Sequence, residues 1–226
     1  MNEDTRISEK LSKIINSEFC GVELSSLVRK RIEEFKKLGE DGFTHFDFNP
    51  FLQMEFDADL FSELCFCILT AGSSVEIGLK IQRELGDRFS VISLKNLFHK
   101  LQEMGHRFAK AKSKYIVAAR EFNLDAVRIQ KDGKIARQIL LSLDGLGLKE
   151  SSHFLRNIGF DDVAIIDRHI FRFLVENKLY PLKNTITPKV YLECEKILEK
   201  LSQILWVSLS ELDLYIFFDK TSKILK

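Results

Sequence analysis

The chain has 226 residues, 45% of them hydrophobic, so it can bury a core as one domain or as two small lobes. Its 11 glycines and 3 prolines are too few for a collagen-like or linker-rich protein. No apolar run approaches the length that crosses a bilayer, and the first apolar residues are spread among charges, unlike a signal peptide. We therefore expect a soluble, cytoplasmic protein with no membrane partner.

The net charge of +1 hides an uneven distribution, because residues 95–137 hold eleven Lys/Arg and only four Asp/Glu. A basic segment in an otherwise acidic or neutral chain suits a polyanionic partner, although such runs are also common on solvated helix faces. The four cysteines (Cys20, Cys65, Cys67 and Cys194) lack metal-ligand spacing. We interpret Cys65 and Cys67 as small core residues, and we expect neither a zinc site nor an iron–sulfur cluster.

Apolar residues recur at intervals of three and four along most of the chain, which predicts helices. Helix-ending and helix-starting residues agree with this pattern: Asp57 or Asp59 precedes a helix, Gly86 and Gly105 follow helices, and Thr187 precedes Pro188. The segment 43–56 alternates briefly, but Pro50 interrupts it, so we expect an extended loop there. The sequence predicts an all-α protein with helices over 24–38, 60–69, 77–85, 94–104, 114–122, 135–143, 169–179, 190–205 and 212–218.

A tight turn, DGLG, separates two of these helical patterns at residues 144–147. Glycine tolerates positive φ and close backbone approach, so Gly145 and Gly147 allow a very short connection. The free N–H groups and the positive dipole end of the second helix would then form an anion site. A plain αα-hairpin turn without a ligand is also compatible with this spacing.

Lys149 lies at the start of the second helix, where the helix dipole disfavours another positive charge. A partly desolvated amine at this position would be a nucleophile, whereas a surface lysine in a polar first turn is the simpler alternative. Asp167 precedes the pattern RHIFRFLVENK and is typical of an N-cap. Capping would also hold its carboxylate rigid and ionised opposite a developing positive charge.

The stretch LDGLGLK at 143–149 resembles the helix–hairpin–helix of base-excision DNA glycosylases, whose pattern L-P-G-x-G-x-K ends in a catalytic lysine. Asp144 stands where that superfamily usually has proline. The spacing of 18 residues from Lys149 to Asp167, with KESSHFLRNIGF and IIDRHIFR, resembles the type 2 8-oxoguanine DNA glycosylase/AP lyases. The likeness covers most of residues 55–226, including ELCFCILTAGSS, RFAKAKSKYIVAAR and the C-terminal LDLYIFFDKTSKILK.

This resemblance implies that Lys149 attacks C1′ of a flipped nucleotide and that Asp167 stabilises the positive charge on the sugar. It also implies that Gly145 and Gly147 hold a DNA phosphate, with a possible monovalent cation on the hairpin carbonyls. The pocket for the base would use Asp213, Phe217 (where relatives commonly have tryptophan), Met104, and Lys226 with its terminal carboxylate. Candidate phosphate contacts in the basic segment are Arg107, Lys110, Lys112 and Lys114. Gly72 stands where relatives carry a wedging Asn or Gln, so filling the gap left by the base would depend on Ser73, Ser74 or another loop.

The resemblance implies a two-lobed protein with its active site in the cleft between the lobes. We expect residues 58–165 to form the bundle with the hairpin, and residues 1–57 plus 166–226 to form the second lobe. The implied function is removal of 8-oxoguanine from duplex DNA followed by β-elimination at the abasic site, with no required cofactor or catalytic metal. We expect a monomer associated with the nucleoid. The alternatives are a helix–hairpin–helix module that only binds DNA, a glycosylase for another lesion, and a helical protein–protein adaptor.

Overall fold

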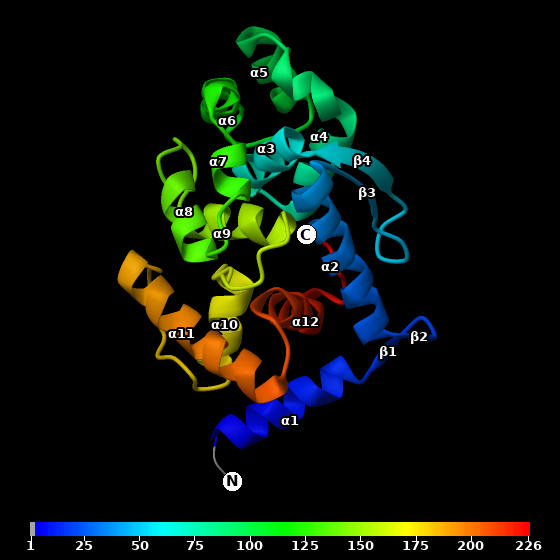
Figure 1. Cartoon of the computed structure of the whole chain (residues 1–226), viewed down its shortest axis with the longest axis vertical. Coiled ribbons are helices and arrows are strands. Elements are labelled where there is room, and N and C mark those ends of the chain that lie inside the picture. The colour runs from blue at the N-terminus through cyan, green and yellow to red at the C-terminus, as the bar shows by residue number, and fades with distance from the viewer. Residues whose placement is uncertain (1–2) are drawn as a thin grey trace.

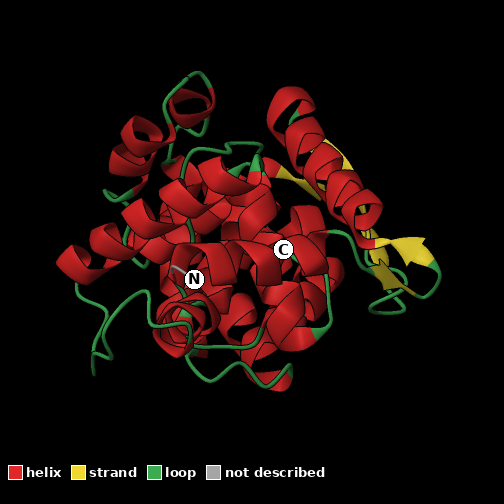
Figure 2. Ribbon diagram, turned by 90° about the horizontal axis from the view of Figure 1, so that it is seen from below, coloured by secondary structure: helices red, strands yellow, loops and turns green. Residues whose placement is uncertain are grey.

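The computed structural model describes residues 3–226, with side chains from residue 6 onward, and it is mostly helical (Figure 1). The predicted all-α class is therefore confirmed. In Figure 2 the strands lie at one side of an otherwise helical molecule. The helices are α1 (Glu3–Ile15), α2 (Leu24–Asp41), α3 (Leu60–Thr70), α4 (Val75–Leu85), α5 (Leu94–Glu103), α6 (Ala109–Ala118), α7 (Asp125–Arg128), α8 (Gly133–Leu140), α9 (Leu148–Asn157), α10 (Arg168–Glu176), α11 (Pro188–Leu205) and α12 (Leu209–Thr221), with 3₁₀ turns at Gly86–Ser90 and Ala119–Glu121.

Local capping explains several helix boundaries. The Asp59 carboxylate accepts a hydrogen bond from the Ser62 N–H at 2.7 Å, so Asp59, and not Asp57, begins α3. Thr187 caps α11 with Pro188 in its first turn, and Gly86 ends α4, as predicted. The helix predicted at 135–143 ends earlier, at Leu140, because the hairpin turn begins there.

The expectation of an extended loop at 43–56 was wrong. Strands β3 (Phe43–Asp47) and β4 (Glu55–Asp59) pair antiparallel, with Phe46 opposite Phe56. Pro50 lies in the connection between the strands, where it removes no hydrogen bond from the ladder. The alternation in this segment buries Thr44, Phe46, Phe56 and Ala58 on one face, as a half-buried sheet requires. A second, two-residue hairpin, β1 (Glu18–Phe19) with β2 (Val22–Glu23), was not predicted.

The described residues bury two hydrophobic clusters. The larger is built around α3, whose residues 62–70 are all buried, and it includes side chains of α2, β3, β4, α9 and the last residues of the chain. Cys65 and Cys67 are fully buried in it as free thiols, which confirms their predicted place in the core. The smaller cluster joins α1, α10, α11 and α12, which lie together in the lower half of Figure 1.

The two clusters can be compared with the two predicted lobes. One lobe was predicted at residues 58–165, and the other was predicted from residues 1–57 together with 166–226. Residues of α2, β3 and β4 pack in the larger cluster together with 58–165. The division into lobes stays a prediction. Helix α9 packs on α2, α3 and α8, and the chain then continues into α10 of the smaller cluster. The hairpin helix is therefore placed next to the point where the two clusters meet.

Among residues 3–226 no single helix is long and apolar enough to cross a membrane. Helices α11 and α12 pass that test only as a pair, by length and composition, and they are bent by 97° relative to each other.

Candidate functional site at the hairpin

A pocket of about 870 Å³ opens beside the hairpin helix and collects most of the predicted site residues. Its lining comes from the loop after α3, the loop before α6, α9, the segment entering α10, α12 and the C-terminus. The predicted site residues among its lining are Lys149, Asp167, Asp213, Phe217, Lys226 and Arg107.

The two hairpin glycines differ in how strongly the structure requires them. Gly145 has φ of +90°, and a Cβ there would lie 2.5 Å from Cδ2 of Tyr115, so both conformation and space require glycine. Gly147 is extended, with φ of −106°, and any residue could adopt that backbone. A Cβ on Gly147 would lie 3.3 Å from the Glu150 carboxylate, which accepts a hydrogen bond from the Gly147 N–H at the same distance. One N–H predicted to hold phosphate is therefore bonded to an internal carboxylate.

Lys149 lies in the first turn of α9, and its side chain is 27% exposed. Its Nζ is 3.4 Å from Oε1 of Glu150, so the amine contacts an acid but is not enclosed in a buried ion pair. The amine also lowers the pKa of the Asp213 carboxyl, which lines the same pocket. Lys149 is therefore accessible from the pocket and lies among groups with which it interacts electrostatically.

Asp167 is the N-cap of α10, as predicted. Its Oδ1 accepts a hydrogen bond from the Ile170 N–H at 2.8 Å, which fixes the carboxylate at the pocket wall. The charge of Asp167 raises the pKa of Asp213. The structure therefore brings Lys149 and Asp167 to one pocket with Asp213 close to both.

Asp213 is already paired in this structure. Its Oδ2 lies 2.6 Å from NH1 of Arg156, and that guanidinium also donates from Nε to Oδ1 of Asn157 at 2.9 Å. Burial is the largest effect on the Asp213 carboxyl and raises its pKa to about 7, against the opposing effect of Arg156. The predicted contact to the base thus requires this carboxyl to share its oxygens between Arg156 and the ligand.

Lys226 is held by its side chain inside the larger cluster. Its ammonium bonds Gln82 Oε1 at 2.6 Å and the buried Glu63 carboxylate, and it lies 4.0 Å from the ring centroid of Phe46. The Glu63 carboxylate also accepts from Asn157 at 2.6 Å. The Lys226 side chain is therefore held by these groups and is not free to contact a ligand in the pocket.

Two phenylalanine rings, Phe108 and Phe217, line the pocket, although only Phe217 was predicted. Phe217 is half-buried, with its ring centroid 5.6 Å from that of His169. Met104 is absent from the pocket lining, because it ends α5 and packs against the larger cluster. Phe108 lines the pocket instead and is 41% exposed. The sequence signal that indicates Phe108 is an aromatic residue directly after Arg107 in the basic segment.

Phe108 also explains why Gly72 stands where relatives were expected to carry Asn or Gln. A Cβ on Gly72 would lie 2.8 Å from Cε2 of Phe108, so the glycine makes room for that ring. Ser74, predicted as an alternative gap filler, caps α4 by accepting from the Ile77 N–H at 3.2 Å. Arg107 lies at the pocket with its guanidinium 5.1 Å from the Phe108 ring centroid, which suits a phosphate contact.

Lys112 is less suited to the phosphate contact predicted for it. It is only 6% exposed, and its Nζ lies 5.8 Å from the centroid of Tyr115, the ring that packs on Gly145. Burial lowers the pKa of Lys112, with Glu150 raising it and Lys149 lowering it further. This places Lys112 beneath the hairpin, close to Lys149 and Glu150. Lys110 and Lys114 are exposed.

His153 is a pocket residue that the sequence analysis did not single out. It lies four residues after Lys149 on α9 and is 5% exposed. Burial, Arg156 and Lys149 lower the pKa of the imidazole well below 6.5, against a smaller opposing effect of the Lys226 backbone. The ring is therefore neutral at physiological pH.

The lowered pKa of His153 predicts a loss of stability in acid. Below pH 6.5 the unfolded chain takes up a proton at this residue that the folded chain does not, so the stabilisation present above pH 6.5 is lost as pH falls. The slope is about 1.4 kcal/mol per pH unit until the folded pKa is reached. We expect His153→Phe to reduce this slope in urea unfolding between pH 7.5 and 5.5. His106, whose pKa is also lowered by burial, stays in both proteins, and the exposed His99→Phe variant should keep the wild-type slope.

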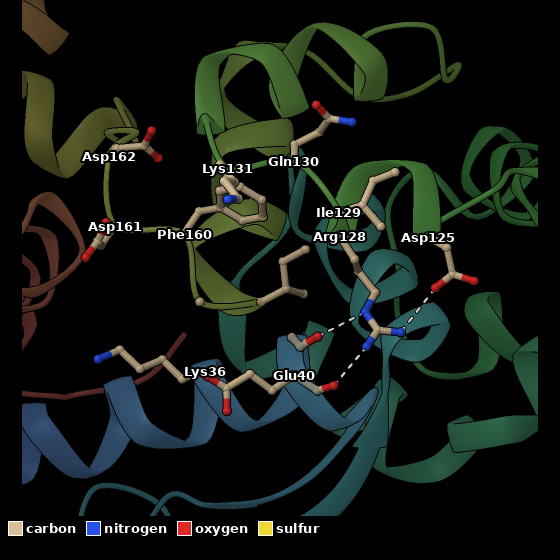
Figure 3. Close-up of a pocket in the computed structure, with 13 residues that line it drawn as sticks. Lys36, Glu40, Asp125, Arg128, Ile129, Gln130, Lys131, Phe160, Asp161 and Asp162 are labelled. Atoms are coloured by element: carbon tan, nitrogen blue, oxygen red, sulfur yellow. Dashed lines mark hydrogen bonds and ion pairs between the residues drawn. The ribbon is translucent and has the colours of Figure 1, made fainter.

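A second pocket, of about 680 Å³, lies away from Lys149 between α2, α7 and the turn after α9 (Figure 3). Arg128 crosses it and donates to the Gly39 and Glu40 carbonyls, both at 2.9 Å, and to Asp125 at 3.1 Å (Figure 3). A Cβ on Gly39 would lie 1.9 Å from the Ile158 carbonyl oxygen. We interpret this region as the place where α2 is held against α7 and the end of α9.

Among the described residues no group of His, Cys, Asp and Glu could hold a metal ion. The hairpin pocket itself holds the Lys149 amine and the carboxylates of Asp167 and Asp213. A lysine amine in the first turn of the second hairpin helix, with a helix-capping carboxylate in the same pocket, is typical of helix–hairpin–helix DNA glycosylases.

Comparison with known proteins supports this class. A family model described as 8-oxoguanine DNA glycosylase matches residues 28–207. The 8-oxoguanine DNA glycosylase/AP lyase of Aquifex aeolicus is 50% identical over 214 residues, covering 90% of this chain and 95% of that protein. The chain belongs to the 8-oxoguanine DNA glycosylase family, and the predicted resemblance is confirmed.

Similar solved structures support the same family assignment. The Methanocaldococcus jannaschii 8-oxoguanine glycosylase/lyase, in complex with a 15mer DNA containing 8-oxoguanine, is 41% identical with a TM-score of 0.84, covering 98% of this chain and 100% of that one. The 8-oxoguanine DNA glycosylase of Thermotoga maritima is 34% identical, also with a TM-score of 0.84, covering 99% and 100%.

Proposed function

We propose that this protein removes 8-oxoguanine from duplex DNA and then cleaves the strand at the resulting abasic site. The observation that carries the proposal is the presence of Lys149 and Asp167 in one pocket beside the hairpin. The family membership and the names of the relatives, 8-oxoguanine DNA glycosylase/AP lyases, support the same activity.

The neutral amine of Lys149 attacks C1′ of the flipped nucleotide. The Nζ–C1′ bond forms as the glycosidic bond breaks, and the base leaves with the bonding electrons and takes up a proton. The sugar ring then opens to a Schiff base with Lys149, loss of a C2′ proton breaks the 3′ C–O bond, and water finally releases the enzyme. Asp167, fixed by the Ile170 N–H, provides a negative charge near the sugar as positive charge develops on it.

The base occupies the pocket after it leaves the helical stack, a step that costs a few kcal/mol and needs a shaped receptor. Phe217 provides one stacking face, and Phe108, rather than Met104, provides an aromatic ring at the mouth. Asp213 and the terminal carboxylate of Lys226 supply polar contacts to the edge of the base. Arg107 and the hairpin glycines hold phosphates beside the lesion, and a cation on the hairpin carbonyls would support them.

Other parts of the proposal concern the setting of the reaction. The protein acts as a monomer in the cytoplasm, associated with the nucleoid, and needs no cofactor beyond the possible monovalent cation. The excess of Lys/Arg over residues 95–137 favours DNA over a protein partner. A module that only binds DNA has no use for a partly exposed lysine beside a fixed carboxylate, which is why we prefer the enzyme. A glycosylase for another lesion would use the same two residues and differ only in the lining of the pocket.

Borohydride trapping on a duplex with one 8-oxoguanine tests the proposal. We expect wild type to form a covalent adduct and to cut the strand, and Lys149→Gln to form none, because the nucleophilic amine is gone. Lys200→Gln, at an exposed position on α11 outside the pocket lining and outside the basic segment, is the matched control and should trap like wild type. Lesion-independent binding by wild type without adduct or cleavage would leave only a DNA-binding module.

A further inference from the structure

His153 is a buried polar side chain in the pocket without a protein partner. Among the described residues no group forms a hydrogen bond with either Nδ1 or Nε2 of its ring, although the residue is 95% buried. Buried polar side chains are almost always hydrogen-bonded, so this exception needs an explanation. The backbone of Lys226 interacts with the ring and raises the pKa of the imidazole, although neither ring nitrogen has a hydrogen bond of good geometry to it.

The polar neighbours of His153 are, in contrast, hydrogen-bonded to one another. Arg156 is satisfied by Asp213 and Asn157, and Glu63 accepts from Asn157, Gln82 and Lys226. Ser151 also has an unpartnered hydroxyl on α9, but it does not line the pocket. The polar groups under the pocket thus satisfy one another, and the imidazole is left with unused hydrogen-bonding capacity at the pocket itself.

The separation of His153 from Lys149 along α9 is comparable to the size of a nucleotide. Residues four apart lie on the same face of a helix, one turn from each other, so His153 is about 6 Å along α9 from Lys149. When C1′ lies beside the Lys149 amine, before the glycosidic bond breaks, the attached base extends from it by a comparable distance. The edge of the Phe66 ring contacts the imidazole, with the centroids 5.5 Å apart at 74°, which holds its orientation.

We propose that the His153 imidazole hydrogen-bonds the edge of the flipped 8-oxoguanine and makes His153 a specificity-determining residue. A neutral imidazole has one donor and one acceptor, and an 8-oxopurine edge presents both kinds of group. Buried as a neutral ring between Lys149 and Arg156, it contributes a hydrogen bond and does not carry a proton to the leaving base. This inference rests on the proposed function and assigns a residue for reading the base.

The test separates recognition of the base from the chemistry of the lysine. His153→Phe keeps the ring shape and the contact with Phe66 but cannot hydrogen-bond, whereas His153→Gln keeps a donor and an acceptor. Two single-turnover rates are compared: base release from an 8-oxoguanine duplex, and strand cleavage of a duplex with a preformed abasic site. The second substrate has no base to recognise, so it reports only on Lys149 and on DNA binding.

We expect His153→Phe to lower base release by roughly ten- to a hundredfold, the effect of one lost hydrogen bond to a buried group, and to lower abasic-site cleavage far less. His153→Gln should recover part of the base release. His99→Phe, an exposed histidine outside the pocket, is the matched control and should match wild type in both rates. Melting temperatures verify that each variant is folded.

Two results would overturn the inference. Equal losses in both rates would show that His153 acts through Lys149 or through the fold, and no loss in either would show that the ring does not contact the base. If His153→Phe does not fold, His153→Gln is measured alone. Base release below the wild-type rate with abasic-site cleavage nearly unchanged then supports the inference, and equal losses in both rates or no loss in either contradict it. Absence of base release by wild type would instead contradict the proposed function.

Discussion

Replacing Asp167 with asparagine is expected to lower the rate of 8-oxoguanine release by about 10²- to 10⁴-fold with little loss of stability. The asparagine side-chain oxygen can accept the Ile170 N–H as the aspartate does, so α10 stays capped. The variant removes only the negative charge that faces the sugar when the glycosidic bond breaks. Base release under single-turnover conditions and the melting temperature measure the two roles separately.

Asp132→Asn is the matched control for Asp167→Asn. Asp132 caps α8 through the Lys134 and Ile135 N–H groups and lies outside the hairpin pocket. We expect this control to release base at the wild-type rate. If Asp167→Asn also stayed within about tenfold of wild type, the carboxylate would be only a cap.

Replacing Arg137 with methionine is expected to lower the free energy of unfolding by about 3–5 kcal/mol. Its guanidinium holds both carboxylate oxygens of Glu195 at 2.6 and 2.8 Å, and each side chain is only 3% exposed. The same Glu195 accepts the Ala164 N–H at 3.0 Å, so the pair ties α8 to α11 and to the segment that leads into Asp167. Without Arg137 a buried carboxylate remains with no counter-charge. Urea unfolding at neutral pH measures the effect.

Two further variants make the stability result interpretable. Lys134→Met removes a 2.6 Å contact with Glu199 between the same two helices, but Lys134 is 53% exposed. We expect a loss below about 1 kcal/mol there, because surface ion pairs contribute little. The double variant Arg137→Met with Glu195→Met should recover most of the stability lost by Arg137→Met, since no unpaired charge stays buried. A loss by Arg137→Met as small as that of Lys134→Met would contradict the argument.

The parts of the fold that were predicted correctly depend on neighbours along the chain. The N-caps at Asp59, Asp167 and Thr187 act on N–H groups two or three residues ahead, so sequence spacing is enough to locate them. The same holds for the hairpin, where Gly145 needs positive φ between two amphipathic helices. The strands β3 and β4 were missed because Pro50 was taken to interrupt a single strand, and only the pairing of β3 with β4 shows that it lies between two strands.

The details of the pocket depended on contacts between distant segments. The space for Phe108 comes from Gly72, and the anchor of Lys226 is Glu63, 163 residues away. Met104 and Lys112 carry suitable chemistry but pack against the larger cluster and under the hairpin, respectively. Sequence spacing cannot separate a helix residue that faces a pocket from one that faces the core, because both faces repeat with the same period.

The sequence by itself determined the helical class, the hairpin, the spacing of Lys149 and Asp167, and the family, since each of these is a local pattern of residues. Only the tertiary structure decided that Asp213 is already paired with Arg156, that Phe108 replaces Met104 at the pocket, and that His153 is buried without a partner. The physical reason is that burial and hydrogen bonding depend on which helices pack together. The rings and charges that line this pocket come from segments more than a hundred residues apart, and their arrangement is fixed only when both clusters are formed.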